Sequence, residues 1–192
     1  MSTNYVVYGE RIAIRKMEFE DCGMIVNWRN KDRVRSNYIY REKISLSEQE
    51  KYYREQVQTG KVYHYVCCLR ENDRPFGCMV LKDMREEERQ IEFGSFIGED
   101  DCVGLGLGGE ISVVGYRYVF DNFPVDRIVL EIMADNKASM FSHGKGGAKP
   151  YKKADAVMCS DGIRRDMVLY EVWRDDMIAG SKGTKSGSSL LE

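Results

Sequence analysis

Four glycines fall within six positions of Val103–Ile111, a segment that reads VGLGLGGEI and runs into a helix-like sequence. Glycine costs a chain backbone entropy, so this cluster indicates a backbone that needs positive φ angles or a close approach by another group. Backbone N–H groups with no side chains around them can converge on an anion, and the positive end of a helix dipole adds to that attraction. The segment therefore predicts either a phosphate-binding loop or a flexible turn that begins a helix.

Two familiar glycine-rich loops do not fit this segment. A Walker loop requires a Lys-Ser or Lys-Thr pair after its last glycine, and the chain has Glu110 and Ile111 there. A Rossmann fingerprint follows the first strand of a parallel unit with the spacing G-x-G-x-x-G. This cluster follows hairpin-like sequence and has the spacing G-x-G-x-G-G. A pyrophosphate held on the amides of the loop and the first helical turn is the remaining chemistry, beside the plain alternative of a flexible turn.

The composition limits the partners of the chain. Its 192 residues carry a net charge of −2, which gives no electrostatic footprint for nucleic acid or for an acidic membrane. No apolar run approaches the roughly 20 residues that span a bilayer, and the N-terminus lacks the pattern of a signal peptide. We therefore expect no nucleic-acid or membrane partner and a cytoplasmic location.

The cysteine and histidine spacing argues against a metal site. The six cysteines form no C-x-x-C pair, and the two histidines have no paired ligand spacing. Cys67 and Cys68 are adjacent in the strand-like run VYHYVCCLR, so they should face opposite sides of a sheet. Buried free thiols in a reducing compartment are the expected state of the cysteines.

The elements that position the glycine loop can be predicted from periodicity. Residues 11–17 alternate apolar and charged side chains as a half-buried strand does, and residues 18–30 carry apolar side chains at helical spacing. An amphipathic helix is predicted within residues 43–60, with Ser45 or Ser47 as its N-cap. One strand and two helices thus precede the central part of the chain.

Three strand-like runs with turn signals between them follow in residues 62–70, 76–84 and 90–98 and predict an antiparallel meander. The glycine loop comes next, then a helix in residues 110–123 and a strongly apolar strand in residues 127–136. The apolar face of that helix is predicted to hold Ile111, Val114, Tyr118 and Val119.

The last elements are a run that begins like a helix at Lys137 and decays into glycines, and a final strand in residues 164–173. Residues 179–192 are rich in Gly, Ser and Lys without periodicity, which is typical of a flexible tail. Because strands and helices alternate without an internal repeat, we expect one mixed α/β domain over residues 1–178.

The glycine loop and its flanks resemble the core of the GNAT (Gcn5-related) N-acetyltransferase superfamily. In that family a loop of the form [Q/R]-x-x-G-x-[G/A] joins a strand to a helix and binds the pyrophosphate of acetyl-CoA. Val103–Gly108 is similar to this loop, with Val103 in place of Gln or Arg, and the similarity continues through RIVLEIMADNKAS. The resemblance implies an α/β fold: a single GNAT-like domain with a mixed, mostly antiparallel sheet, flanked by helices and splayed between the strands in residues 90–98 and 127–136.

The resemblance also implies acetyl-CoA as the cosubstrate and assigns residues to it. The pantetheine arm inserts between the splayed strands, where backbone groups of Phe96 and Ile97 pair with it and donate to the thioester oxygen. The other implied cofactor-binding residues are Val103, Gly104, Leu105, Gly106, Leu107, Gly108, Gly109, Asn136, Ser139 and Lys145.

Acetyl transfer to an amine needs a group that takes a proton from the attacking ammonium. Glu92 is the best-placed carboxylate, since it lies on the strand beside the thioester. The alternative is that Glu92 is a surface residue that pairs with a side chain of the neighbouring strand. Glu131 is a second candidate. His143 takes the Tyr or His position of the family's N-x-x-[AS]-…-[YH]-E-K pattern, where it could protonate the leaving thiolate or hydrogen-bond to the sulfur end of the cofactor.

The segment MIVNWRNKDRVRSNYIY in the N-terminal half resembles the RimJ/RimL-type branch, which includes acetyltransferases of protein N-termini and of amino-sugar nucleotides. The resemblance implies acceptor binding by Trp28, Arg29 and Asn30. Aromatic residues and Arg29 suit a stacked sugar or nucleotide with a phosphate. Our main hypothesis is an N-acetyltransferase of a small-molecule amine, an amino sugar or its nucleotide conjugate, with a homodimer as a candidate assembly.

Two alternatives stay open. One is acetylation of a protein N-terminal amine. The other is a non-catalytic acyl-CoA-binding module, which Val103 and the glycines at Gly144 and Gly146 favour because they depart from the family pattern. Each interior glycine costs a helix about 1 kcal/mol relative to alanine, so the helix that begins at Lys137 should be short or frayed.

Overall fold

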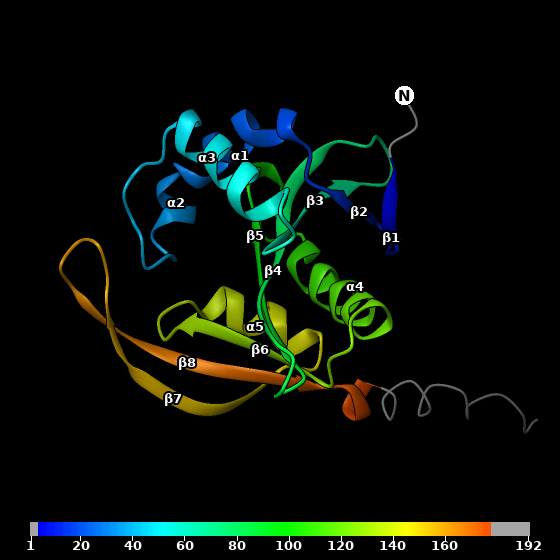
Figure 1. The fold of residues 1–192 in the computed structure, drawn as a ribbon, viewed down its shortest axis with the longest axis vertical. Coiled ribbons are helices and arrows are strands. Elements are labelled where there is room, and N and C mark those ends of the chain that lie inside the picture. Colours follow the sequence, from blue (N-terminus) through cyan, green and yellow to red (C-terminus); the bar gives the residue numbers. More distant parts are fainter. Residues whose placement is uncertain (1–3, 178–192) are drawn as a thin grey trace, which may run out of the picture.

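Eight strands form one open sheet in the computed structural model, which describes residues 4–177 (Figure 1). Their order across the sheet is β1-β2-β3-β4-β5-β6-β8-β7. The strands are Tyr5–Tyr8 (β1), Ile12–Lys16 (β2), Tyr63–Leu69 (β3), Pro75–Arg85 (β4), Gln90–Ile97 (β5), Arg127–Met133 (β6), Lys149–Met158 (β7) and Arg164–Trp173 (β8). Neighbouring strands are antiparallel except β5 and β6, which are parallel, so the predicted mixed sheet and its central meander are confirmed.

Helices cover both faces of this sheet. They are Cys22–Arg29 (α1), Asp32–Arg35 (α2), Leu46–Tyr52 (α3), Leu107–Asn122 (α4) and Lys137–Lys145 (α5). A π-helical turn over Tyr53–Val57 prolongs α3, and 3-10 turns lie at Phe19–Asp21 and Asp100–Cys102. Figure 1 shows α1–α3 gathered at one end of the molecule, and β7 and β8 as a long curved hairpin whose tip approaches the segment after α2.

The two faces of the sheet carry separate hydrophobic cores. Cys67 of β3 belongs to the larger cluster beneath α4, whereas Cys68 belongs to the smaller cluster beneath α1, which also contains Trp28. Adjacent residues of this strand therefore face opposite sides, as predicted. All six cysteines are buried as free thiols. Because helices cover both faces, β3 is a nearly continuous buried run and not an alternating one.

Helix α4 packs on the larger core with a stripe that differs in part from the predicted one. Ile111 and Val119 are fully buried as predicted, whereas Val114 and Tyr118 are only partly buried against the same cluster. Tyr116 is fully buried instead. Periodicity placed the helix correctly but did not resolve which aromatic side chain points to its centre.

Periodicity does not predict three of the elements: β1, α2 and β7. β1 and β7 are the edge strands of the sheet, so they need no apolar alternation. β7 begins KPYKK and is mostly exposed, and lysine and proline in such a place protect a free edge from pairing. α2 has four residues, which is too short to establish a helical period.

The helix ends follow side-chain caps and close packing. The hydroxyl of Ser45 accepts from the Glu48 N–H at 3.2 Å, and the Glu48 carboxylate accepts from the Ser45 N–H at 2.7 Å, which confirms one of the two predicted N-caps. Helix α5 is short, as expected, and ends at Lys145 with Gly146 as its C-cap. A Cβ on Gly146 would lie 2.6 Å from the ring of Tyr116, so this glycine lets α5 approach α4.

The predicted tail in residues 179–192 lies outside the described residues, and with it the predicted domain boundary. Within residues 4–177, no helix combines the length and apolar character needed to cross a membrane.

Candidate active site

Strands β5 and β6 pair over three residues and then separate. The pairs are Gln90–Arg127, Ile91–Ile128 and Glu92–Val129. β5 continues to Ile97 and β6 to Met133, and the register between them extends no further within the described residues. The predicted splay is therefore confirmed, and it leaves the Phe93–Ile97 backbone without a strand partner on the β6 side.

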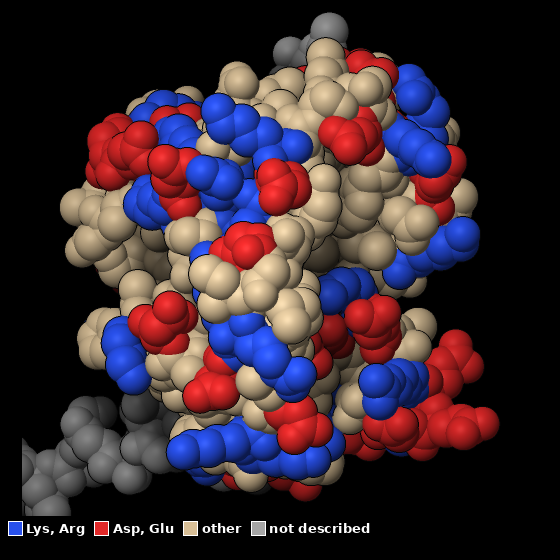
Figure 2. Space-filling model, turned by 90° about the vertical axis from the view of Figure 1, so that its left-hand side faces the viewer, with Lys and Arg blue, Asp and Glu red and all other residues tan. Residues whose placement is uncertain are grey.

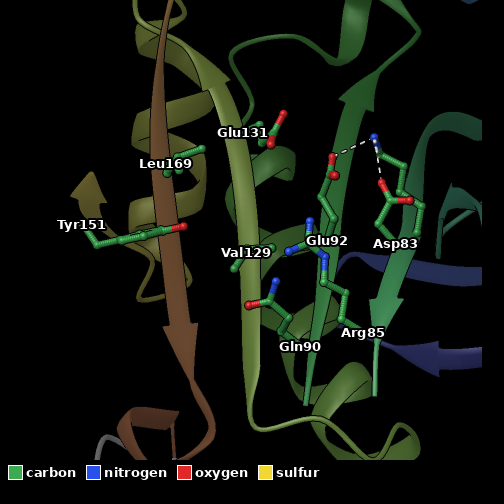
Figure 3. A pocket seen from close by; sticks show the side chains of 9 residues that line it. Asp83, Arg85, Gln90, Glu92, Val129, Glu131, Tyr151 and Leu169 are labelled. Carbon is green, nitrogen blue, oxygen red and sulfur yellow. Dashed lines mark ion pairs between the residues drawn. The ribbon is translucent and has the colours of Figure 1, made fainter. Parts of the chain in front are cut away.

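A cavity of about 320 Å³ opens on the sheet face beside the splay (Figure 3). Its lining residues are Lys82, Asp83, Arg85, Gln90, Glu92, Val129, Glu131, Tyr151 and Leu169. Glu92 comes from β5 and Glu131 from β6, so two carboxylates border the cavity from either side of the splay. A Cβ on Gly94, two residues after Glu92 on the same face, would have nothing within 4 Å. Space of this size suits a small molecule.

The carboxylate of Glu92 is held by Lys82. Lys82 Nζ lies 2.9 Å from Glu92 Oε1 and 3.7 Å from Asp83 Oδ2. Only 18% of the Glu92 side chain is exposed, and this burial raises its pKa above the ordinary value. The Lys82 charge opposes that shift, and the Glu131 carboxylate adds to it. A carboxylate with raised proton affinity inside a cavity is suited to accept a proton.

A β-bulge in β4 sets the register between Lys82 and Glu92. An unbroken ladder continued from the β4–β5 turn would place Lys82 opposite Phe93, whose side chain lies on the other face. One extra residue in the stretch Asp83–Met84 brings Lys82 opposite Glu92 instead. Asp83 adopts a φ of +48°, a left-handed conformation that costs a non-glycine residue about 1 kcal/mol or more. The ion pair beside the splay therefore depends on a local strain.

Two of the residues predicted to bind the acceptor amine, Trp28 and Asn30, form hydrogen bonds with other parts of the protein. Trp28 is buried, and its indole N–H donates to Glu99 Oε1 at 2.7 Å. The amide of Asn30 donates to the Ile44 carbonyl and accepts from the Ile44 N–H, both at 2.8 Å. These contacts tie α1 to the end of β5 and to the segment that precedes α3.

Arg29 is the third residue predicted to bind the acceptor amine, and one nitrogen of its guanidinium group makes no hydrogen bond among the described residues. Its guanidinium carbon lies 3.3 Å from the centroid of the Tyr38 ring. Its Nη1 is buried and has no hydrogen-bond partner in the described part of the chain. The Tyr38 ring meets Phe96 edge-on at 6.3 Å, and Trp28 meets Phe96 at 6.5 Å. An aromatic cluster with a cation therefore borders the end of β5.

Hydrogen bonds from residues at the start of α2 hold the end of β5 in place. Arg33 Nη1 donates to the Ile97 carbonyl at 2.8 Å, and Lys31 Nζ donates to the Gly98 carbonyl at 2.9 Å. A Cβ on Gly98 would lie 2.2 Å from the Trp28 ring, so only glycine fits there. The predicted cofactor-binding residue Ile97 therefore has its carbonyl engaged by Arg33.

The predicted pyrophosphate loop leads directly into α4. Gly104 and Gly106 have φ angles of +80° and +79°, which glycine adopts without strain. Gly106 is the N-cap of α4, so the first helical amides follow it directly. Val103 and Leu105 expose their side chains. A glycine turn at a helix N-terminus is a suitable place for an anion.

Gly108 and Gly109 meet a different requirement. A Cβ on Gly108 would lie 2.9 Å from Ser142 Oγ, and one on Gly109 would lie 3.3 Å from Lys145 Cβ. These two glycines therefore allow α5 to pack against the first turn of α4. The cluster combines a left-handed turn with a helix contact.

The polar residues of the motif after β6 hold α5. Asn136 is the N-cap of α5, and its Oδ1 accepts from the Ser139 N–H at 3.1 Å. The Lys145 ammonium lies 5.0 Å from the centroid of the exposed Phe141 ring. Asn136 follows the end of β6, on the far side of the splay from β5.

His143 is buried between α5 and α4. Its Nδ1 lies 2.7 Å from the Tyr116 hydroxyl and 3.0 Å from the Ser112 hydroxyl. Burial lowers the pKa of His143 to about 4, so the ring is neutral at neutral pH. Burial also raises the pKa of Tyr116, which keeps its hydroxyl available as a donor. A hydrogen bond donated by Tyr116 would place the ring proton on Nε2, and one donated by Nδ1 would place it on Nδ1.

Lys82, Asp83 and Tyr151 line the cavity but are not predicted as site residues from the sequence. The predicted meander brings Lys82 near Glu92, but a one-residue bulge decides whether the two share a face, and this bulge has no signature in the sequence. Tyr151 lies on β7, which periodicity does not predict. A turn-based register count that allowed for a bulge would have found Lys82.

The segment after α2 forms hydrogen bonds with the turn between β7 and β8, although the two are far apart in the sequence. The Ser160 N–H donates to the Ile39 carbonyl at 2.9 Å, and the Arg41 N–H donates to Ser160 Oγ at 2.8 Å. We call this contact of residues 38–42 with residues 159–163 the arch. Figure 2 faces this side and shows hollows on both sides of a central column that carries charges of both signs. A second cavity of about 230 Å³ is lined by Asp32, Arg35, Ser36, Arg41, Glu42 and Asp161.

The fold is shared with solved acetyltransferases of low sequence identity. A spermidine N-acetyltransferase from Vibrio cholerae in complex with CoA and spermine has a TM-score of 0.80 at 16% identity, over 88% of this chain and 99% of that chain. RimL, a ribosomal L7/L12 α-N-protein acetyltransferase in complex with coenzyme A, has a TM-score of 0.77 at 13% identity, over 90% and 99%. The aminoglycoside acetyltransferase AAC(6')-Ib in complex with coenzyme A and kanamycin has a TM-score of 0.74 at 16% identity, over 88% and 99%.

A search of curated proteins gives no match. The family model of the acetyltransferase (GNAT) domain, in contrast, matches residues 11–149, from the start of β2 to the start of β7. This match covers the splayed strands, the glycine loop and α5. The chain therefore belongs to the GNAT acetyltransferase family, whose cosubstrate is acetyl-CoA.

Proposed function

We propose that this acetyltransferase acts on the primary amine of a small molecule, an amino sugar or a nucleotide-linked amino sugar. The observation that carries the proposal is the cavity beside the splay, bordered by Glu92 and Glu131. Carboxylates attract a cationic amine, and a volume of about 320 Å³ suits a small acceptor. The other lining groups, among them Gln90 and Tyr151, offer partners for sugar hydroxyls.

The nucleotide-linked form is supported by Arg29. A buried guanidinium nitrogen without a partner carries a desolvation cost, and a phosphate oxygen would satisfy it. The Tyr38 ring lies in the same cluster and suits a flat or ring-shaped group. In this proposal Arg29 contacts the acceptor, while Trp28 and Asn30 shape the wall that carries it.

Glu92 is proposed as the catalytic base. Acetyl-CoA, when bound, supplies an acetyl group activated as a thioester. Glu92 attracts the acceptor's ammonium and takes its proton, directly or through one water, which frees the nitrogen lone pair for attack. Its raised pKa favours this transfer, and Glu131 across the cavity holds the positive charge nearby. Lys82 keeps the Glu92 carboxylate in place until the acceptor arrives.

The residues proposed to hold the cosubstrate surround the diverging strands. Beyond Glu92, β5 has no strand partner on the β6 side, so this edge is proposed to receive the pantetheine arm near Phe96 and Ile97, where the Ile97 carbonyl already accepts from Arg33. The loop fits a pyrophosphate because its left-handed glycines leave the first amides of α4 uncovered. The proposed set is Phe96, Ile97, Val103, Gly104, Leu105, Gly106, Leu107, Gly108, Gly109, Asn136, Ser139 and Lys145.

His143 is proposed to hydrogen-bond to the sulfur end of the cosubstrate. With a pKa of about 4, the His143 ring carries no extra proton at neutral pH that it could give to the leaving thiolate. Of the two roles expected for His143, the hydrogen bond is therefore favoured. This role requires the tautomer with the proton on Nε2, in which Nδ1 accepts from the Tyr116 hydroxyl. His143→Phe would remove the donor while it keeps an aromatic ring in the packed site.

Release of free CoA thiol tests the proposed function. The purified protein is incubated with acetyl-CoA and a panel of acceptors: free amino sugars, nucleotide-linked amino sugars, spermidine, an aminoglycoside and an N-terminal peptide. We expect the highest kcat/KM with an amino sugar, and with its nucleotide conjugate above the free sugar. Higher activity with the peptide would instead support acetylation of a protein N-terminal amine.

Binding of acetyl-CoA, measured by calorimetry without acceptor, is the control for this panel. Binding without turnover of any acceptor would overturn the proposal in favour of an acyl-CoA-binding module. Glu92→Gln should keep this binding and lose turnover. The expected homodimer is part of the proposal and can be measured by light scattering.

A further inference from the structure

Arg11 lies directly against the glycine loop although it comes from the other end of the chain. It precedes β2, and its Nη1 donates to the Leu105 carbonyl at 2.9 Å. Its backbone N–H donates to Glu110 Oε1 at 2.7 Å, and its Nε donates to Glu110 Oε2 at 2.9 Å. Both ends of Arg11 are thus fixed to the segment that begins α4.

The backbone around Arg11 is also anchored. The Arg70 N–H donates to the Arg11 carbonyl at 2.9 Å, and the Arg70 guanidinium donates to the Gly9 carbonyl at 2.8 Å. The turn that leads into β2 is therefore held on the sheet side as well as on the α4 side. A guanidinium positioned in this way loses little further side-chain entropy when it binds a ligand.

The remaining nitrogen of Arg11 faces the left-handed turn. Arg11 Nη2 lies 3.6 Å from the position that a Cβ of Gly106 would take, and among the described residues other than the two chain neighbours of Gly106 no further heavy atom lies within 4 Å of that position. Half of the Arg11 side chain is exposed. The N-cap glycine of α4 therefore opens toward a cation that has donors left for an incoming group.

Position 103 lacks the side chain that usually assists this loop. The family pattern has Gln or Arg there, and the side chain of Val103 offers no hydrogen-bond donor. We propose that Arg11 supplies the missing cation and binds a phosphate group of the cosubstrate through Nη2. Glu110 accepts from Arg11 through both carboxylate oxygens and so acts as a positioning residue for the guanidinium. This inference rests on the proposed role of the loop in binding the pyrophosphate.

Calorimetry with Arg11→Met tests the proposal with two ligands. CoA carries phosphates, and pantetheine has the same arm without them. We expect the affinity for CoA to fall about tenfold or more, because a charge-assisted hydrogen bond is lost. The affinity for pantetheine should stay at the wild-type value. Equal loss for both ligands, or no loss for CoA, would overturn the proposal.

A transplanted arginine separates a charge effect from damage to the fold. The double variant Arg11→Met with Val103→Arg restores the family pattern, so it should recover most of the lost CoA affinity. The melting temperature without ligand reports any structural cost of Arg11→Met. Failure of the wild-type protein to bind CoA would refute the assignment of the loop itself, whereas wild-type affinity in Arg11→Met refutes only the role of Arg11.

Discussion

Gly104 lies in the turn before α4 and Gly108 in the first turn of the helix, and a side chain at each would meet a different obstacle. Gly104 has a φ of +80° and open space around it, so the cost of a Cβ there is backbone strain. Gly108 lies within α4, and its obstacle is Ser142 Oγ at 2.9 Å. The sequence shows two identical glycines, and the structure separates a conformational requirement from a packing requirement.

These two obstacles lead to different mutational behaviour. We expect Gly104→Ala to lower the free energy of unfolding by about 1–2 kcal/mol through strain, and Gly108→Ala to lower it by about 1–3 kcal/mol through overpacking. Ser142→Ala removes the hydroxyl and should rescue Gly108→Ala alone. Urea denaturation of the ligand-free single and double variants measures the coupling. Equal rescue of Gly104→Ala would contradict this assignment.

Glu92 links catalysis to pH. If Glu92 acts as the base in its ionised form, kcat/KM should fall on acidification through a pKa that burial raises above the ordinary glutamate value. Glu92→Gln should lower kcat about a hundredfold or more and abolish this acid limb. A pH profile of kcat/KM measures both effects. Full activity in Glu92→Gln would remove the residue from the mechanism.

Two neighbouring charges provide controls for this pH profile. The Lys82 ammonium lowers the pKa of Glu92, so Lys82→Met should move the acid limb to higher pH. The Glu131 carboxylate raises that pKa, so Glu131→Gln should move the limb to lower pH. Shifts of opposite sign identify Glu92 as the titrating group.

At the scale of elements, what could be predicted depends on how apolar residues recur. The meander, α4 and β6 were predictable because buried faces repeat at fixed spacing, and the glycine loop because its composition is unusual. The edge strand β7 has no buried repeat, and with it Tyr151 of the cavity was missed. Lys82 and Arg11 owe their positions to a bulge and to a contact with a loop far along the chain, which local spacing does not encode.

The arch is an element-scale feature whose opening can be measured. Ser160→Ala removes the oxygen that accepts from the Arg41 N–H and leaves the Ser160 N–H bond to Ile39 intact. We expect faster hydrogen exchange of the Arg41 amide and a higher KM for the acceptor, with unchanged affinity for CoA. Mass-spectrometric exchange and steady-state kinetics report these effects.

Ser36→Ala is a matched control for the arch, since the Ser36 hydroxyl makes a 3.4 Å bond to the Arg33 carbonyl next to α2. This variant should leave both the exchange of Arg41 and the KM for the acceptor at wild-type values. If Ser160→Ala behaves as the control does, the hydrogen bond does not hold the arch closed.

At the scale of the whole molecule, two buried histidines couple stability to pH. His64 in β3 has both ring nitrogens buried without a partner among the described residues, and burial lowers its pKa to about 4. His143 on the other side of the sheet has a pKa lowered to about 4 as well. The unfolded chain takes up protons near pH 6.5 while the folded chain does not, so stability is lost as the pH falls from 6.5 toward 4.

His64→Phe should make the protein more stable and less sensitive to acid. It keeps the edge contact that the His64 ring makes with Tyr52 at 5.9 Å and removes two unsatisfied polar atoms. We expect a higher melting temperature at pH 7 and a smaller decrease between pH 7 and pH 5.5. Calorimetry over this range measures both. Because the chain has two histidines, the histidine-linked slope that remains belongs to His143. A lower melting temperature at pH 7 would contradict the assigned cost.

The three residue pairs between β5 and β6 also form a seam between two parts of the molecule. Strands β1–β5 lie on one side and β6–β8 on the other, and they share this short ladder and the core beneath α4. The pantetheine arm of the cosubstrate, bound between the diverging strands, would contact both parts. Its binding free energy would then add to the free energy of unfolding of the folded state. When acetyl-CoA is bound, the two parts should therefore unfold more cooperatively, and the protein should resist proteolysis better.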